Sequence, residues 1–532
     1  MKPSSVRGSS SAAMGRSSTR RAWQRRRLPS ATAMLGYLKR LATTGAAYQA
    51  ADVVSRVFAL VTLPLYLHHV SDADYGVAEV VVTAVVLASI PLRLGLGEAF
   101  VRFWYLDEDP ARRRRLARTT TAAVFWVTTL AGVVALPFAG PLSEALLGRH
   151  DAVVLGFGLL GLWAFANLEV GKALLRVEER WRAFLVATVG NVTLTVALTV
   201  ALVVIRDEGA RGLVAGNFVA SAVTVVVLGV VLRRYVGLLP SRAALAPLLR
   251  FGLPTVPADA AAFALNVIDR AYLLRADSAG AAGRYSLSVK VASVVIVAVR
   301  GFQYAWPPLA YSVTDDEEAR RLYGVVTTWF LAVTGLVVAA LTLLGRWVLR
   351  LFFPAQFLGA FDALPWVALG WALSGLFLVY VVVAGRLRVT ARNVPAAVAG
   401  LAVNVVLLVL LVGPLGIAGA GIALCAAYVV MLGVLHALTR RRFAIAFEWG
   451  RLARLAAVLG GGAVAGELLL PTSGAGGLAA RAALTAALPV LLLASGFLSP
   501  EERERARSVA PLGWPRRRRE RRRQERHTTG EV

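Results

Sequence analysis

Charged residues are scarce in this chain of 532 residues, and their scarcity excludes most soluble folds. Only 17% of the residues are Asp, Glu, Lys or Arg, whereas a soluble domain carries about 25%. Cysteine occurs once, as Cys425, so no internal disulfide can form. Lysine is also rare, and arginine supplies almost all of the positive charge.

The usual signatures of catalysis and of metal or nucleotide binding are missing as well. Gly171-Lys172 lacks both the earlier glycine and the following Ser or Thr of a phosphate-binding loop, and no H-E-x-x-H occurs. The five histidines are scattered, and no loop outside the two tails exceeds about 20 residues. We therefore expect no enzyme activity, no cofactor, no metal and no folded domain outside the membrane.

Apolar residues make up 57% of the chain and its mean hydropathy is +0.65. Stretches of about 20 apolar residues, long enough to cross a bilayer as a helix, recur along the whole length. The sequence therefore predicts an all-α, polytopic integral membrane protein with about fourteen transmembrane helices. The predicted spans are 41–67, 76–101, 118–143, 151–175, 183–205, 211–232, 251–275, 285–309, 323–345, 361–385, 394–413, 416–438, 452–472 and 478–499.

The loops between these spans alternate in charge. "RFWYLDEDPARRRRLAR", "RVEERWR", "RRYVGLLPSR" and "RRRFAIAFEWGR" are rich in arginine, whereas "HHVSDAD", "GPLG" and "PTSGAGG" have neither Lys nor Arg. Positive short loops mark the cytoplasmic side, so we expect both termini to lie in the cytoplasm. The net charge of +27 lies mostly in these loops and the tails. This placement favours contact with anionic membrane lipids at the tails and disfavours nucleic acid.

The long connection after the sixth span divides the chain into two halves. "SDADYGVAEVVVTAVVLASIPLR" at 71–93 parallels "SAGAAGRYSLSVKVASVVIVAVR" at 278–300, which favours two parallel six-helix repeats with a substrate site between them. The expected organisation is a basic tail (1–40), an N-terminal lobe (41–232), a linker (233–250), a C-terminal lobe (251–440), an additional helix pair (441–499) and a second basic tail (500–532).

Ionisable residues inside predicted spans concentrate on the first, second, seventh and eighth spans, which are equivalent pairs in the two halves. A charge in the bilayer interior costs about 2.5–3.5 kcal/mol even on lenient scales, so such residues are expected to line a wet central cavity. The candidates for substrate binding are Arg56, Arg93, Arg270, Lys290 and Arg300. The candidates for coupling to a proton or a cation are Asp52, Glu98, Asp259 and Asp269. Cationic residues slightly outnumber acids, which suits an anionic cargo such as a diphosphate.

A structural explanation of the same residues stays open. Asp52 with Arg56, and Asp269 with Arg270, are neutralising pairs in that reading, and Arg93 and Glu98 reach the membrane surface by extending along the helix. The seventh span also places Asp259, Phe263, Asn266 and Arg270 on one stripe if its helix is continuous.

Several segments, in this order, resemble one family. "LPLYLHHVSDADYGVAEV" at 63–80, "LGLGEAFVRF" at 94–103, "LRFGLPTVPADAAAFALNVIDRAYLL" at 249–274 and "GRYSLSVKVAS" at 283–293 resemble the polysaccharide transporters of the multidrug/oligosaccharidyl-lipid/polysaccharide exporter superfamily. The resemblance covers about residues 41–440. It implies two six-helix lobes around a cationic cavity that works by alternating access, and it matches Asp269, Arg270 and Lys290 best.

The resemblance implies a flippase that moves undecaprenyl-diphosphate-linked oligosaccharide across the cytoplasmic membrane. Its implied partners are that lipid-linked substrate and the polymerase and glycosyltransferases of surface-polysaccharide synthesis. Two alternatives stay open. A cation-coupled multidrug antiporter of the same fold should have an acidic cavity, and a non-transporting membrane scaffold should have all its charges paired or at the interface.

Overall fold

Helices are the regular secondary structure of the part of the chain that the structure describes. The computed structural model describes residues 53–106, 109–265, 267–313, 315–387, 389, 392–499 and 502–503, and it begins with the helix Val53–Leu67. The further helices are α3 (Asp72–Leu92), α4 (Leu96–Leu106), α5 (Pro110–Ala135), α6 (Ala139–Leu147), α7 (Ala152–Val177), α8 (Trp181–Val200), α9 (Gly209–Val231), α10 (Arg242–Gly252), α11 (Val256–Leu265), α12 (Ile268–Ala276), α13 (Ala279–Ala292), α14 (Val294–Ser312), α15 (Asp316–Phe352), α16 (Leu364–Arg386), α17 (Asn393–Thr439), α18 (Trp449–Leu455), α19 (Gly461–Leu469) and α20 (Gly474–Ala494).

The all-α, multi-pass class is confirmed. Among the described residues ten helices are long and apolar enough to cross a bilayer, or eleven if α13 and the first half of α14, bent by 48°, count as one. The predicted spans 394–413 and 416–438 correspond to the two helices of α17, which meet at a kink at Gly416, where φ is 54° and ψ is −137°. The predicted span 251–275 is divided into the short helices α11 and α12, and the predicted span 41–67 is described only from residue 53.

Local sequence explains where helices begin and break. Ser71 starts α3 by accepting a hydrogen bond from the Asp74 backbone N–H, and Asp109 accepts one from Ala111 at the start of α5, with proline in the first turn. Such side chains satisfy N–H groups that have no partner within the helix. Between α3 and α4, Leu94 and Gly95 both have positive φ, 52° and 64°, which ends α3 and turns the chain.

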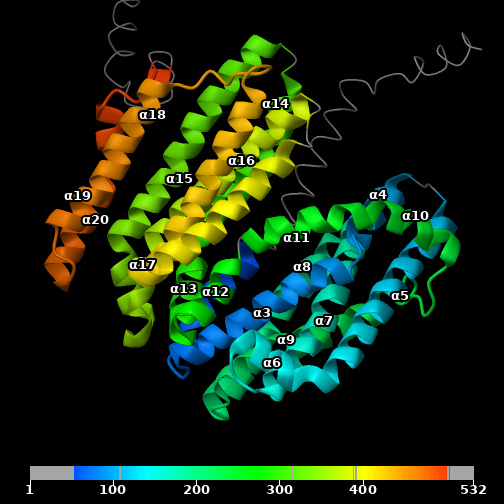
Figure 1. Cartoon of the computed structure of the whole chain (residues 1–532). Coiled ribbons are helices and arrows are strands. Elements are labelled where there is room, and N and C mark those ends of the chain that lie inside the picture. Colours follow the sequence, from blue (N-terminus) through cyan, green and yellow to red (C-terminus); the bar gives the residue numbers. More distant parts are fainter. Residues whose placement is uncertain are drawn as a thin grey trace, which may run out of the picture.

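The helices form two groups that lie on either side of α3 and α13 (Figure 1). In one group α5, α7, α8 and α9 pack beside α3, and in the other α14, α15, α16 and α17 pack beside α13. The ends at which α7 and α9 finish and α5 starts lie together, because Tyr235 bonds to Glu178 and to Thr121. We call this end, with its arginine-rich loops, the basic end. Whether the two groups are domains with the boundaries 41–232 and 251–440 stays a prediction.

The two groups meet through a close backbone contact at the other end of α3 and α13. A Cβ atom added to Gly76 would lie 1.9 Å from the carbonyl oxygen of Ala279, and one added to Gly283 would lie 2.0 Å from that of Asp72. Only glycine allows backbones to approach this closely. The Arg284 guanidinium adds an ion pair across the same contact, 2.6 Å from the Asp72 carboxylate. In Figure 1 the helix groups diverge from this contact toward α4 and α10 on one side and α14 and α16 on the other.

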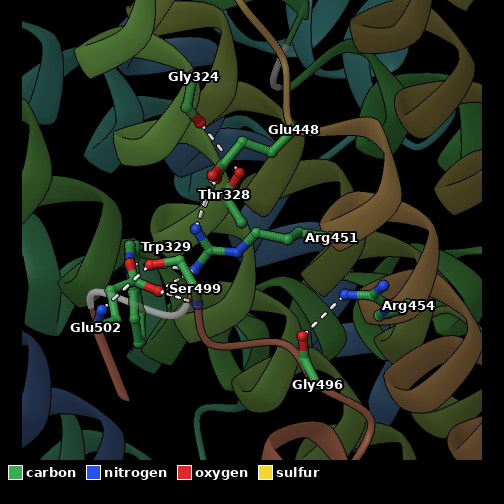
Figure 2. A network of polar contacts seen from close by, with 9 residues as sticks. All are labelled: Gly324, Thr328, Trp329, Glu448, Arg451, Arg454, Gly496, Ser499 and Glu502. Carbon is green, nitrogen blue, oxygen red and sulfur yellow. Dashed lines mark hydrogen bonds and ion pairs between the residues drawn. The ribbon is translucent and has the colours of Figure 1, made fainter. Parts of the chain in front are cut away.

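The last two spans form an addition that packs on the outside of α15 (Figure 1). Arg451, only 8% exposed, bonds to Glu448 at 2.8 Å and to Glu502 at 2.9 Å, and Figure 2 shows both contacts. Its guanidinium also lies 4.7 Å from the ring centroid of Phe497. Trp329 of α15 donates to the same Glu502 carboxylate at 2.9 Å. Arg451 and Glu502 thus fix the end of the chain's last helix pair to α15.

We expect Gly76→Ala to weaken the contact between the two helix groups. The added methyl group has no room against Ala279, and overpacking of this kind costs about 1–3 kcal/mol. Thermal unfolding of the purified protein in detergent, followed by tryptophan fluorescence, measures the loss. Gly97→Ala in α4 is the matched control, because nothing lies within 4 Å of its added Cβ atom. Equal melting temperatures for the two variants would contradict the assignment of this contact.

We expect Arg451→Ala to release residues 495–499, together with Glu502, from α15. It leaves two carboxylates without their shared cation, a loss of about 3 kcal/mol for a largely buried pair. Hydrogen exchange of this segment is the measurement, and Arg454→Ala is the control, because Arg454 is exposed and donates to the Gly496 carbonyl without forming an ion pair among the described residues. Unchanged protection in Arg451→Ala would contradict the proposed role.

The same contact has a defined dependence on pH. Burial alone would raise the pKa of the Glu502 carboxyl, but hydrogen bonds from Ser499, Trp329 and Arg451 hold that pKa below its ordinary value. A carboxyl with a lowered pKa contributes its stability in full above the unfolded value of about 4.3 and loses it as pH falls through the lowered one. Protection of residues 495–499 should therefore persist at pH 5 and disappear only in stronger acid.

Candidate functional site

Three helices, α3, α12 and α13, bring ionisable residues together where the two helix groups meet. Asp269 is 1% exposed and accepts a hydrogen bond from the Tyr285 hydroxyl at 2.5 Å, while its second oxygen is buried with no donor among the described residues. A carboxylate in an apolar interior is costly unless it is hydrogen-bonded or neutralised. Asp269 is thus bonded to Tyr285 of α13, whereas its neighbour Arg270 bonds to a different helix.

Arg270 crosses from α12 to α3. Its Nη1 donates to the hydroxyl of Thr83 at 3.2 Å, and its Nε–H is buried without an acceptor among the described residues. No carboxylate of the described residues lies within ion-pair distance of this guanidinium. An arginine with unused donors in the interior of a membrane protein is equipped to accept an anion.

Lys290 is paired, unlike Arg270. Its ammonium lies 2.5 Å from the Glu79 carboxylate and 5.1 Å from the centre of the Tyr75 ring. The side chain of Lys290 is 38% exposed, and that of Glu79 is 14% exposed. This pair joins α13 to α3, near the ion pair of Arg284 with Asp72.

Sequence reasoning missed Glu79, Asp72 and Arg284. Glu79 lies within the predicted second span, so the same search for charges inside spans could have found it; Asp72 and Arg284 lie at helix starts that look exposed in sequence. With them included, three acids (Asp72, Glu79, Asp269) face three cations (Arg270, Arg284, Lys290) at the α3–α12–α13 junction. The cationic excess predicted for these helices is therefore balanced at the junction, and Arg270 is its member without a carboxylate partner.

Two of the predicted residues lie elsewhere. Arg93 and Glu98 line a pocket of ≈ 320 Å³ between α4 and α7, together with Glu169 and Arg176. Arg93 follows Glu79 by fourteen positions along α3 and its C-cap, a rise of about 21 Å. The structure thus places the predicted residues in two groups, one at the junction and one at the basic end.

The remaining candidates are not part of either group. Arg56 is exposed on the first described helix, Asp259 is exposed on α11, and Arg300 is partly buried on α14 with no polar partner among the described residues. Asp52 lies outside the described residues. The stripe from Asp259 to Arg270 is not continuous, because the helix breaks before Val267, where φ is −138° and ψ is −16°. In the described part of the chain, no three His, Cys, Asp or Glu residues are grouped to hold a metal.

The geometry defines a class of protein. A multi-pass helical bundle whose two helix groups touch at one end, with ionisable residues at that contact, has the architecture of a membrane transporter. Solved structures agree. The structure is similar to "Lipid II flippase MurJ, inward closed conformation", with a TM-score of 0.68 and 12% identity over 85% of this chain and 98% of that one.

Two further structures share the fold. An inward-facing multidrug resistance MATE family transporter of the MOP superfamily has a TM-score of 0.58 and 16% identity, covering 73% of this chain and 96% of that one. An outward-facing one has a TM-score of 0.53 and 17% identity, over 76% and 94%. No curated protein matches the sequence. Residues 43–309 match the family described as "Polysaccharide biosynthesis protein", and the chain belongs to this family.

We expect Lys290 and Glu79 to be energetically coupled. Lys290→Met alone leaves Glu79 without its cation, which should cost about 1–3 kcal/mol, less than a fully buried pair loses because Lys290 is partly exposed. Adding Glu79→Gln should restore part of this loss. A double-mutant cycle on unfolding in detergent measures the coupling. The exposed pair Arg321–Glu317 is the control, with a coupling below about 0.5 kcal/mol; equal coupling in both pairs would contradict a role for Lys290 in joining α3 to α13.

Proposed function

We propose that the protein is a flippase for lipid-linked oligosaccharide, carrying undecaprenyl-diphosphate-linked repeat units across the bacterial cytoplasmic membrane for surface polysaccharide. Membership of the polysaccharide biosynthesis family supports the pathway, and the transporter fold supports movement of a cargo. The observation that carries the proposal is Arg270, a partly buried guanidinium at the contact between the two helix groups, whose Nε–H has no acceptor and which has no carboxylate partner among the described residues. A diphosphate is the kind of acceptor that a planar guanidinium binds well.

In this proposal the diphosphate binds where the helix groups diverge from the α3–α13 contact. Arg270 and Lys290 would act at the junction, Arg300 on the neighbouring helix α14, and Arg93 nearer the basic end. Arg56 is retained as a further candidate on the first described helix. The short-loop charge rule supports a cytoplasmic location of the basic end and of both termini. The polymerase and glycosyltransferases of the same pathway are the proposed partners.

Asp269 is the candidate for coupling transport to an ion. It is buried, it has one oxygen without a donor, and it adjoins Arg270, so its ionisation and the binding of an anion at Arg270 would influence each other through charge. Glu98 and Asp259 are more exposed and remain further candidates, together with Asp52.

A multidrug antiporter is the second candidate, and one observation favours it. The junction carries as many acids as cations, because Glu79 and Asp72 accompany Asp269. An acidic interior suits a cationic drug better than a diphosphate. The two functions differ in what the loss of Arg270 should do: removing a cation harms the binding of an anion and leaves the binding of a cation intact.

We expect Arg270→Ala to reduce surface polysaccharide to below about a tenth of the wild-type amount. A charge-assisted hydrogen bond contributes about 1.5–3 kcal/mol, so its loss should lower transport at least tenfold. The variant is expressed in a bacterium that lacks the chromosomal copy, with polysaccharide quantified at the cell surface and the protein in isolated membranes. Arg321→Ala, which removes an exposed arginine, is the control and should export normally.

Two results would contradict the flippase. If Arg270→Ala is present at the normal level and the cells still export normal amounts of polysaccharide, Arg270 is not part of the substrate site. Unchanged polysaccharide after deletion of the whole gene, together with increased sensitivity to cationic dyes, would favour the antiporter instead.

A further inference from the structure

Two pockets adjoin each other at the basic end of the first helix group. The first, of ≈ 470 Å³, is cationic and is lined by Arg114, Arg115 and Arg118 of α5, with Thr119 and Ser241. The second, of ≈ 240 Å³, is apolar and lies between α5, α7 and α9, with Trp126 and Trp163 in its wall. Both pockets share Val236, Gly237 and Leu238, so one short segment forms the boundary between them.

That segment, residues 235–241, is fixed along α5 by hydrogen bonds; we call it the strap. Trp126 Nε1 donates to the Leu238 carbonyl at 2.7 Å, the Gly237 N–H donates to the Thr121 hydroxyl at 3.1 Å, and Arg118 Nε donates to the Val236 carbonyl at 3.3 Å. A Cβ atom on Gly237 would lie 2.2 Å from the Arg118 carbonyl oxygen, so the strap touches the helix directly. The strap is therefore a built wall between the two pockets.

The outer side of the strap is apolar although arginines surround it. Leu238 is 82% exposed and Leu239 is 81% exposed. Large apolar side chains next to a cluster of arginines are typical of a surface that lies at the boundary between lipid headgroups and acyl chains. The strap is thus placed where it can contact both the headgroup and the acyl chains of a lipid.

The three pocket arginines have no carboxylate partner among the described residues. In the same helix turn Arg112 pairs with Asp109 at 3.6 Å, whereas Arg114, Arg115 and Arg118 form no ion pair there. Three guanidinium groups around one pocket recognise a phosphate, and each basic residue at a membrane surface adds to the attraction for anionic lipid.

We propose that the two pockets together bind one anionic phospholipid, with its phosphate among Arg114, Arg115 and Arg118 and part of an acyl chain between Trp126 and Trp163. The site takes lipid from the leaflet at the basic end. It lies on α5, which Figure 1 places on the far side of α7 and α9 from the second helix group. A lipid held there is away from the α3–α13 contact, so the occupant is a phospholipid of the bilayer and not the transported substrate.

Lipid titration of the purified full chain, followed by native mass spectrometry, tests the proposal. Phosphatidylglycerol should bind about tenfold more tightly than phosphatidylcholine with the same acyl chains, because only the former carries a net negative charge for the arginines. The triple variant Arg114→Gln, Arg115→Gln, Arg118→Gln should lose this preference. The control neutralises Arg440, Arg441 and Arg442, three consecutive exposed arginines after α17, and should keep it.

A second variant tests the apolar pocket. Gly229 lines it, and nothing lies within 4 Å of an added Cβ atom, so Gly229→Leu introduces an apolar side chain into the pocket from a position where its Cβ atom has room. It should weaken binding of phosphatidylglycerol several-fold and leave the melting temperature of the lipid-free protein unchanged. Gly190→Leu in α8, which also meets open space and lines neither pocket, should bind as wild type.

Three outcomes would overturn the proposal. Equal binding of the two lipids by the wild type would show that the three arginines do not select an anionic lipid. An equal loss of preference in the Arg440–Arg442 control would show that the preference depends on net charge alone. Displacement of phosphatidylglycerol by inorganic phosphate from wild type and Gly229→Leu alike would show an ion site without an acyl chain. None of these readouts requires transport, so they stand whether or not the protein is a flippase.

Discussion

The close contact of α3 with α13 is the constraint on which the rest of the structure depends. Two glycines, Gly76 and Gly283, let the backbones touch, and this approach decides which side chains can meet across it. Lys290 reaches Glu79 and Arg284 reaches Asp72 because the two helices lie this close, and Arg270 reaches Thr83 of α3 from the neighbouring helix α12. In lipid, helix association depends on such packing and on polar contacts rather than on the hydrophobic effect. One feature therefore both joins the helix groups and assembles the ionisable residues.

The α3–α13 contact joins the two helix groups over a short region only. It lies at one end of the helices, while the groups diverge toward the other (Figure 1). Its ion pairs are partly exposed: the Arg284 and Lys290 side chains retain 31% and 38% of their surface. Partly hydrated charges cost less to separate than fully buried ones. Such a contact suits a protein that must open at either end in turn, as alternating access requires.

Sequence reasoning predicted the class of fold well and the site only in part, for a physical reason. Apolar length and loop charge are local properties, so the membrane helices were found without knowledge of packing. The break at Gly416 was predicted, because "GPLG" separates two apolar stretches. The break at Val267 lies within one apolar stretch and depends on a single backbone conformation, which hydropathy does not record. The partners of Lys290 and Asp269 are more than ten residues distant in sequence, so their pairing required the three-dimensional contact. A charge inside a span predicts that some partner exists, but not which one.

The distribution of paired and unpaired arginines separates structure from function in this molecule. Arg451 and Arg481 are buried and bonded to carboxylates within their own region, and they fix the last helix pair to the bundle. Arg270 is partly buried and its Nε–H has no acceptor among the described residues, and Arg114, Arg115 and Arg118 surround a pocket without a carboxylate partner among those residues. An unused donor alone does not distinguish the two kinds, because the Nε–H of Arg451 also lacks an acceptor among the described residues. The difference lies in the carboxylates: Arg451 and Arg481 are neutralised within the chain, whereas Arg270 and the three arginines of α5 have no carboxylate partner among the described residues. In the proposals made above it is this second kind that binds an anion, both at the helix-group contact and at the membrane surface.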